Sequence, residues 1–186
     1  MHDITGSPSR SYGRKGLLAA FDWMHALVVS LVAIVLLFTF AVRIVAVDGD
    51  SMLPTLQDHD RLLLSCFADR YDAGDIVVVD RYTDDPLIKR VIAVAGDTVR
   101  IDNNRLYING IYQQEEYIIG YTVQRDLTEE VTVPAGCVFV MGDNRTISKD
   151  SRMHEIGMVS CKDIVGRVVC RVWPPNAIRV YKNLDR

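Results

Sequence analysis

The hydrophobic and polar positions of the chain divide it into two parts with different patterns. The first part holds 17 consecutive uncharged residues from Ala26, and the apolar run continues beyond Arg43 to Val47. At ~1.5 Å of rise per residue, a helix of about 17 to 22 residues approaches the ~30 Å thickness of a bilayer core. The pattern therefore predicts a transmembrane helix over residues 24–46, preceded by a cytoplasmic tail over residues 1–23.

The charges that flank the predicted anchor indicate its orientation. Arg10, Arg14 and Lys15 lie before it, and Asp48 and Asp50 follow it. Because cytoplasmic flanks carry an excess of basic residues, we expect a single-pass protein of the cell membrane with its N-terminus in the cytoplasm. A cleavable signal peptide has a shorter apolar segment, of about 7 to 15 residues, and a buried core helix has a polar face. An uncleaved anchor in the lipid bilayer is therefore favoured over both alternatives.

The rest of the chain, residues 47–186, consists of short apolar or alternating runs separated by turn signals. No stretch in it has helical periodicity of comparable strength. We therefore predict a mostly β extracytoplasmic domain, with a small hairpin lobe at residues 104–132. The expected strands cover residues 61–67, 76–81, 87–94, 98–101, 106–108, 131–133, 138–141 and 164–173.

Composition and charge limit the classes of partner. Among 186 residues, 49% are hydrophobic, which is too many for a disordered chain and enough for one ordinary domain. Residues 47–186 carry 17 basic and 22 acidic side chains, a net charge of −5. A negative domain without a basic stripe is unsuited to binding phosphate backbones, so nucleic acid is not an expected partner.

The cysteines and histidines do not have the spacing of metal ligands. There is no C-x-x-C pair, and the groupings around His59 and His154 differ from metal-binding motifs such as H-E-x-x-H. We predict no metal site. The sequence leaves the cysteines open between one or two disulfides and small buried apolar side chains. They are Cys66, Cys137, Cys161 and Cys170.

A serine follows the anchor in the segment 49–56, which reads G-D-S-M-L-P-T-L. Pro54 fixes the backbone and disfavours a helix at Leu53, so a turn is expected here. Taken alone, Ser51 is most simply a polar residue of this turn.

A lysine on the predicted strand 87–94 changes that interpretation. Because strand side chains alternate, Lys89 shares a face with Leu87, Val91 and Ala93, all of them apolar. Such a lysine lies at a sheet edge, extends its ammonium to solvent, or is desolvated, which lowers its pKa. A neutral lysine can accept the proton of a serine hydroxyl. Ser51 and Lys89 are therefore a candidate Ser/Lys dyad.

A Ser-His-Asp triad is the alternative. It would need a histidine beyond the anchor, and only His59 and His154 are available. His59 lies between Asp58 and Asp60 in what reads as a solvated turn, and His154 lies in a loop. The dyad is favoured over both.

A third cluster, residues 141–152, reads M-G-D-N-R-T-I-S-K-D-S-R and carries five charges directly after an apolar strand. It is either a solvated surface loop or a buried brace in which Asp and Arg side chains pair and a serine hydroxyl points to the dyad.

Together, these segments resemble the bacterial type I signal peptidases, which are membrane-anchored serine proteases that remove signal peptides from exported preproteins. The matching parts are G-D-S-M-L-P-T-L, L-I-K-R-V-I-A-V-A-G-D and M-G-D-N-R-T-I-S-K-D-S-R, in this order behind one anchor. The resemblance runs from the anchor to about Trp173. It implies an antiparallel β-sheet catalytic domain without a cofactor, and signal-peptide-bearing preproteins as partners.

The resemblance also implies a role for each matching residue. Ser51 would be the nucleophile, Lys89 the general base, and Ser148 would hydrogen-bond the lysine and hold it in place. Structural members of the site would be Arg90, Asp143, Arg145, Asp150 and Arg152, with Arg90 pairing with Asp143. A shallow pocket for the small residue before the cut would be lined by Val47, Met52, Leu56, Leu87 and Ile88.

One position departs from part of the family. Some members carry a serine whose hydroxyl is the second oxyanion donor where this chain has Gly49, as in the compact Gram-positive-like branch. The backbone amide of Ser51 would be one donor, and the sequence does not identify the second.

Two rivals remain. Self-cleaving repressors of the SOS response resemble the Ser/Lys spacing, but they are soluble and carry a DNA-binding domain. A non-catalytic, membrane-tethered β domain that binds a cell-surface partner would keep the anchor and strands without needing Ser51 or Lys89.

Overall fold

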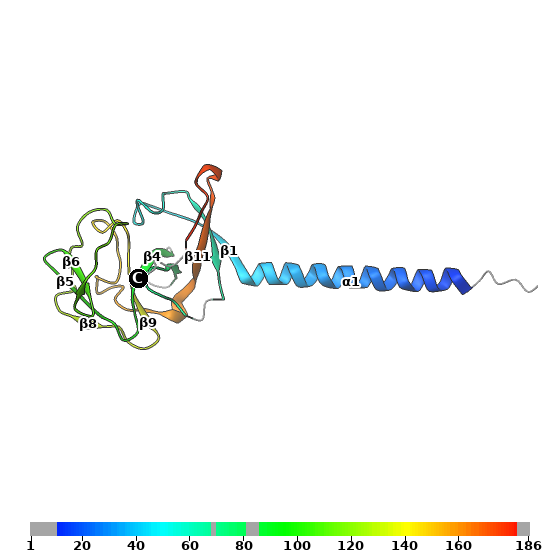
Figure 1. Ribbon diagram of the computed structural model, residues 1–186, viewed down its shortest axis with the longest axis horizontal. Coiled ribbons are helices and arrows are strands. Elements are labelled where there is room, and N and C mark those ends of the chain that lie inside the picture. Colours follow the sequence, from blue (N-terminus) through cyan, green and yellow to red (C-terminus); the bar gives the residue numbers. More distant parts are fainter. Residues whose placement is uncertain (1–10, 68–69, 81–85, 182–186) are drawn as a thin grey trace, which may run out of the picture. The chain divides into compact units, whose positions relative to one another are not determined.

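The computed structural model describes residues 11–67, 70–80 and 86–181, and the chain divides between Phe40 and Ala41 into two compact units. The first unit contains nearly all of the single long helix α1 (Ser11–Ala41), drawn in blue in Figure 1. Within α1, Leu18–Leu36 has a mean hydropathy of 2.0 and is long and apolar enough to cross a membrane. Its side chains are exposed all round, as expected for a helix whose solvent is lipid.

The helix ends five residues before the predicted end of the anchor at residue 46. Val42–Ala46 form β1 instead, which pairs antiparallel with β2 (Arg61–Ser65). The apolar run beyond the helix is rich in β-branched residues, and a short run of this kind suits a strand as well as a helix. The second unit therefore begins before residue 47.

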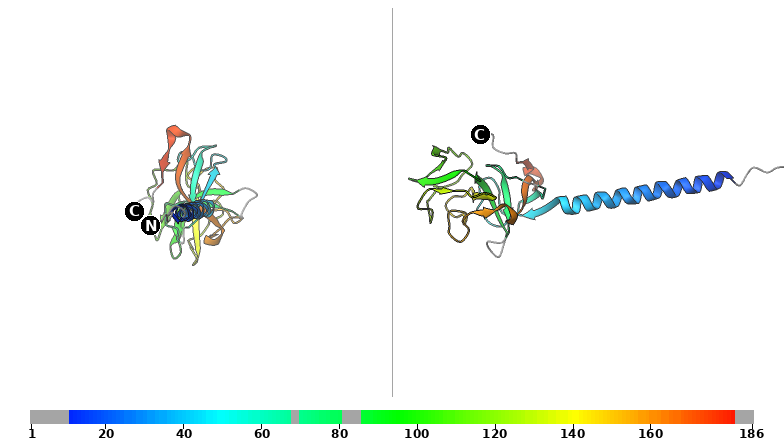
Figure 2. Two further views of the ribbon diagram at one scale, coloured as in Figure 1. Left: turned by 90° about the vertical axis from the view of Figure 1, so that its right-hand side faces the viewer. Right: turned by 90° about the horizontal axis from the view of Figure 1, so that it is seen from below.

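The large sheet of the second unit has the order β1-β2-β11-β3-β4-β9-β10, with β12 paired to β11, and every pair is antiparallel. The sheet is curled, as the views of Figure 2 show. The mostly β antiparallel fold is thus confirmed. The strands not yet given are β3 (Ile76–Val79), β4 (Leu87–Val94), β9 (Cys137–Met141), β10 (Val159–Ser160), β11 (Ile164–Trp173) and β12 (Arg179–Val180). Two 3₁₀ turns accompany them, η1 (Cys161–Asp163) and η2 (Pro175–Ala177).

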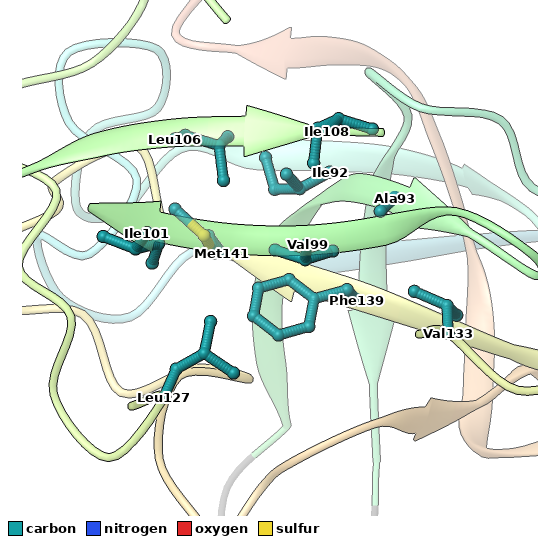
Figure 3. Packing of buried hydrophobic residues seen from close by; sticks show 10 residues of the cluster. All are labelled: Ile92, Ala93, Val99, Ile101, Leu106, Ile108, Leu127, Val133, Phe139 and Met141. Atoms are coloured by element: carbon teal, nitrogen blue, oxygen red, sulfur yellow. The ribbon is translucent and has the colours of Figure 1, made fainter. Parts of the chain in front are cut away.

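A second, four-stranded sheet forms the small lobe, in the order β7-β6-β5-β8. Its strands are β5 (Thr98–Asp102), β6 (Arg105–Ile108), β7 (Ile111–Tyr112) and β8 (Val131–Thr132). The lobe therefore starts with β5, earlier than the predicted residue 104. Figure 3 shows how Val99, Ile101 and Leu106 of the lobe pack against Phe139 and Met141 of β9, so the two sheets share a core.

The central strand β4 separates the other two hydrophobic clusters. Ile88 packs in one cluster and Val91 in another, which agrees with the predicted alternation. A bulge between Val91 and Ala93 then interrupts the pairing with β9, and Ile92 and Ala93 both join the core of the lobe. The predicted common face of Lys89 and Ala93 is therefore wrong, because the extra residue in β4 shifts the alternation.

Candidate active site

Ser51 stands on a loop whose two ends are hydrogen-bonded to each other. The Val47 N–H donates to Asp60 O over 2.8 Å, and the His59 N–H donates to Val47 O over 3.0 Å. The buried Asp60 carboxylate also accepts a hydrogen bond of 2.7 Å from Arg171 Nη1, which ties this closed end to β11. The loop is therefore anchored to the sheet at its base.

The part of the loop around Ser51 is held from two sides. Met52 and Leu56 insert fully buried side chains into the core. From the segment after β9, Asn144 donates its backbone N–H to Ser51 O over 3.0 Å and its side-chain Nδ2 to Asp50 O over 3.2 Å. Ser51 itself remains half-buried, so its hydroxyl is both fixed and reachable.

Lys89 reaches this serine from the middle of the sheet. Its Nζ donates to Ser51 Oγ over 2.9 Å and to Ile88 O over 3.0 Å, and only 2% of the residue is exposed. Burial lowers the pKa of the Lys89 ammonium from 10.5 to about 8, although the carboxylates of Asp150 and Asp143 oppose this shift. A substantial fraction of the amine is therefore neutral near pH 8, which a general base requires.

Next to Lys89, Arg90 forms a buried ion pair with Asp143. Its Nε donates to Asp143 Oδ1 over 2.8 Å and its Nη2 to Oδ2 over 2.6 Å, a bidentate arrangement. Thr55, on the serine loop, also donates its hydroxyl to Asp143 Oδ2. The predicted Arg90–Asp143 pair therefore exists, and it joins the loop of the serine to the strand of the lysine.

Two further arginines are completely buried behind this pair. Arg152 donates through Nε and Nη2 to the two carboxylate oxygens of Asp150, both over 2.8 Å. Burial alone would raise the pKa of Asp150, but the bonds from Arg152 hold it below its usual value. Arg145 pairs with Glu115 through Nη1 and Nη2, at 2.5 and 2.6 Å. The cluster at residues 141–152 is thus a buried brace and not a solvated loop.

Ser148 is also fully buried, beside Gly142. A Cβ added at Gly142 would collide with the Ser148 side chain and lie 2.5 Å from Ser51 O, so only glycine leaves room for this contact. Among the described residues, Ser148 Oγ has no hydrogen-bond partner. The predicted hydrogen bond from Ser148 to Lys89 is therefore not formed in this structure.

A cavity of about 320 Å³ opens beside Ser51 and Lys89. Four of the five residues predicted for the shallow pocket line it, whereas Leu56 is buried in the core below. The walls come from β1 and the residues after it, and from the start of β4. The lining residues are Val45, Ala46, Val47, Asp48, Ser51, Met52, Pro86, Leu87, Ile88 and Lys89.

Comparison with known proteins identifies the family of this site. The family model described as "Signal peptidase, peptidase S26" matches residues 20–173. The chain belongs to this family. It is 36% identical to Signal peptidase I of Bacillus amyloliquefaciens over 176 residues, covering 88% of this chain and 94% of the relative. It is 33% identical to Signal peptidase IB of Staphylococcus aureus over 172 residues, covering 82% and 89%.

A signal peptidase I structure from Enterococcus faecalis aligns with 53% of this chain and 97% of its own, at 29% identity and a TM-score of 0.44. The relatives confirm the resemblance to Gram-positive type I signal peptidases. Membership of the signal peptidase family makes this chain a peptidase, and with its apolar helix it indicates a membrane-anchored protein.

Among the described residues, Ser51 Oγ is hydrogen-bonded to Lys89 and not to either histidine considered as an alternative base. His59 is 91% exposed in its side chain and pairs with Asp58, and His154 is exposed, with its N–H donating to Asp126. Among the described residues, no group of three or more His, Cys, Asp or Glu side chains is arranged to hold a metal ion. The four cysteines are free and half-buried.

Four residues of this signal peptidase site were not predicted from the sequence. Thr55 and Asn144 lie inside the recognised motifs, next to the turn expected at Pro54 and in the polar segment 141–152, and this placement could have suggested a hydrogen-bonding role. Glu115 and Tyr117 lie in the lobe, about thirty positions from their partners, and no local pattern marks them.

Proposed function

We propose that this protein is a type I signal peptidase in which Ser51 is the nucleophile and Lys89 the general base. The hydrogen bond of 2.9 Å between Lys89 Nζ and Ser51 Oγ, made by a buried lysine whose pKa is about 8, carries the proposal. The family of the chain supports it independently.

In the proposed mechanism, neutral Lys89 takes the proton of Ser51 Oγ while this oxygen attacks the scissile carbonyl carbon. The carbonyl oxygen becomes an oxyanion, which the Ser51 N–H stabilises as one donor. The C–N bond then breaks, the leaving amine takes the proton from the Lys89 ammonium, and an acyl-enzyme remains. Lys89 next removes a proton from water, which attacks the ester carbonyl carbon. The C–O bond to Ser51 breaks, Ser51 Oγ takes the proton back from the Lys89 ammonium, and the product acid loses its remaining proton to solvent as the carboxylate.

The cavity and the sheet edge suggest how a preprotein binds. β1 is the terminal strand of the large sheet, and the cavity lies between the residues after it and the start of β4. An extended peptide can add its backbone to such an edge, while alternate side chains enter pockets. A cavity with walls formed by Val47, Met52, Leu87 and Ile88 suits small side chains, so we propose Ala-x-Ala-like ends as substrates.

The signs of the flanking charges favour one orientation in the membrane. We propose a cytoplasmic N-terminus, one transmembrane segment in the lipid bilayer and an extracytoplasmic catalytic domain. A signal peptide embedded in the same bilayer then presents its end on the side of Ser51.

Cleavage of a preprotein with an Ala-x-Ala end by the detergent-solubilised chain tests the proposal. We expect wild type to cut, Ser51→Ala and Lys89→Ala to lose nearly all activity while remaining folded, and the exposed control Lys162→Ala to cut normally. A wild type that cuts nothing would favour the tethered binding domain. A Lys89→Ala variant that still cuts would exclude lysine as the base.

A further inference from the structure

The small lobe contributes two side chains to the buried side of the candidate site. Glu115 is 7% exposed in its side chain, and its two oxygens accept hydrogen bonds from Nη1 and Nη2 of Arg145. Tyr117 donates its hydroxyl to Glu115 Oε1 and places its ring 4.2 Å from the Arg90 guanidinium carbon. Burial and the Glu115 carboxylate raise the pKa of the Tyr117 hydroxyl, so it stays protonated as a donor.

Glu115 also completes the charge balance of this region. Each buried arginine has one carboxylate partner: Arg90 has Asp143, Arg152 has Asp150, and Arg145 has Glu115. The first two carboxylates come from the segment after β9, and only the third comes from the lobe. A buried arginine without its carboxylate is costly, so Arg145 depends on the lobe for its position.

Two short routes lead from Glu115 to the reacting side chains. On one route, Arg145 directly follows Asn144, whose N–H holds Ser51 O at 3.0 Å. The lobe reinforces it, because the Arg145 N–H donates to Ile119 O over 2.9 Å. On the other route, Tyr117 covers Arg90, the neighbour of Lys89 on β4.

We propose that Glu115 is a positioning residue that fixes Ser51 through Arg145 and Lys89 through Tyr117 and Arg90. This inference rests on the proposed function, since its effect is read in the same reaction. With this role for Glu115, the small lobe is a functional part of the candidate site.

The test compares Glu115→Gln, Tyr117→Phe and the exposed neighbour Glu116→Gln in the full, detergent-solubilised chain. A displacement of the reacting groups by about 1 Å lowers turnover by up to about 100-fold. For Glu115→Gln we expect kcat to fall by about tenfold to 100-fold, with KM within about twofold, because the substrate cavity is untouched. Tyr117→Phe keeps the ring on Arg90 and loses only the bond to Glu115, so its kcat should fall less. Glu116→Gln should match wild type.

The folded fraction and melting temperature of each variant are measured beside the kinetics. A loss of kcat in Tyr117→Phe at an unchanged melting temperature supports the inference, even where Glu115→Gln does not fold. The inference is overturned if Tyr117→Phe and folded Glu115→Gln both have the kcat of wild type. It is also overturned if the activity of each variant falls only in proportion to its folded fraction. A wild type that cuts nothing overturns the proposed function and this inference together.

Discussion

Lys89 Nζ donates a hydrogen bond to Ser51 Oγ although 38 positions separate the two residues in the chain. Ser51 stands on the loop between β1 and β2, and Lys89 lies in β4, where only 2% of the residue is exposed. In the proposed mechanism, this contact is the path by which the neutral amine of Lys89 accepts the proton of the Ser51 hydroxyl.

The first prediction concerns the pH dependence of cleavage. In the proposed mechanism only neutral Lys89 accepts the serine proton, and the pKa of Lys89 is about 8. We therefore expect kcat/KM to rise with pH and level off above an apparent pKa near 8. The measurement is a profile of kcat/KM between about pH 6 and pH 10 on a preprotein with an Ala-x-Ala end. A flat profile would exclude titration of this lysine from the reaction.

The second prediction is that the buried lysine destabilises the fold. Its folded pKa of about 8 lies below the unfolded value of 10.5, so the charged form is disfavoured by about 3 kcal/mol in the folded state. This penalty is fully present below pH 8 and disappears as the pH rises to the unfolded pKa. Lys89→Met should therefore increase the free energy of unfolding at pH 7 and much less at pH 10.5. Denaturant unfolding at both pH values checks this, and equal effects at both would contradict it.

The third prediction compares a buried ion pair with an exposed one. Asp143→Asn leaves Arg90 buried without a carboxylate, which should cost about 3–5 kcal/mol in the free energy of unfolding and abolish most cleavage. Asp102→Asn is the matched control, because its pair with Arg100 is 51% and 39% exposed in the side chains. The control should cost less than about 1 kcal/mol. A similar decrease in the free energy of unfolding in both variants would show that burial does not make the Arg90–Asp143 pair more important for stability than the exposed pair.

The fourth prediction concerns Ser148, whose buried hydroxyl has no hydrogen-bond partner among the described residues. Ser148→Ala leaves the three buried ion pairs in place, so the free energy of unfolding should change by no more than about 1 kcal/mol. If the hydroxyl orients Lys89 during turnover, kcat should fall while KM stays near its wild-type value. Steady-state kinetics with unfolding curves separates these effects. A rise in KM alone would argue against an orienting role.

How far the sequence predicts the structure depends on how local the signal is. β4 and β11 have their predicted bounds, because long runs of β-branched residues between turn signals favour one state. β7, β10 and β12 have two residues each and were not predicted, since their pairing depends on partners distant in the chain. The bulge after Val91 has no glycine or proline to mark it.

The same reasoning explains which parts of the candidate site were found. Ser51, Lys89, Arg90, Asp143, Arg145, Asp150 and Arg152 lie in short motifs that resemble a known family, and the structure brings them together. Glu115 and Tyr117 reach the site only because the lobe folds back on the segment after β9. The single local cue, a glutamate near a tyrosine, is too common to indicate a site.

The order of strands in the large sheet has a consequence for the timing of activity. β11, which ends at Trp173, lies between β2 and β3, and thereby joins the half of the sheet near Ser51 to the half that leads to Lys89. Ser51 and Lys89 are both synthesised before β11, the strand that joins their halves of the sheet. A growing chain therefore contains both side chains before the sheet that brings them together can form, so in the proposed mechanism cleavage has to wait for β11.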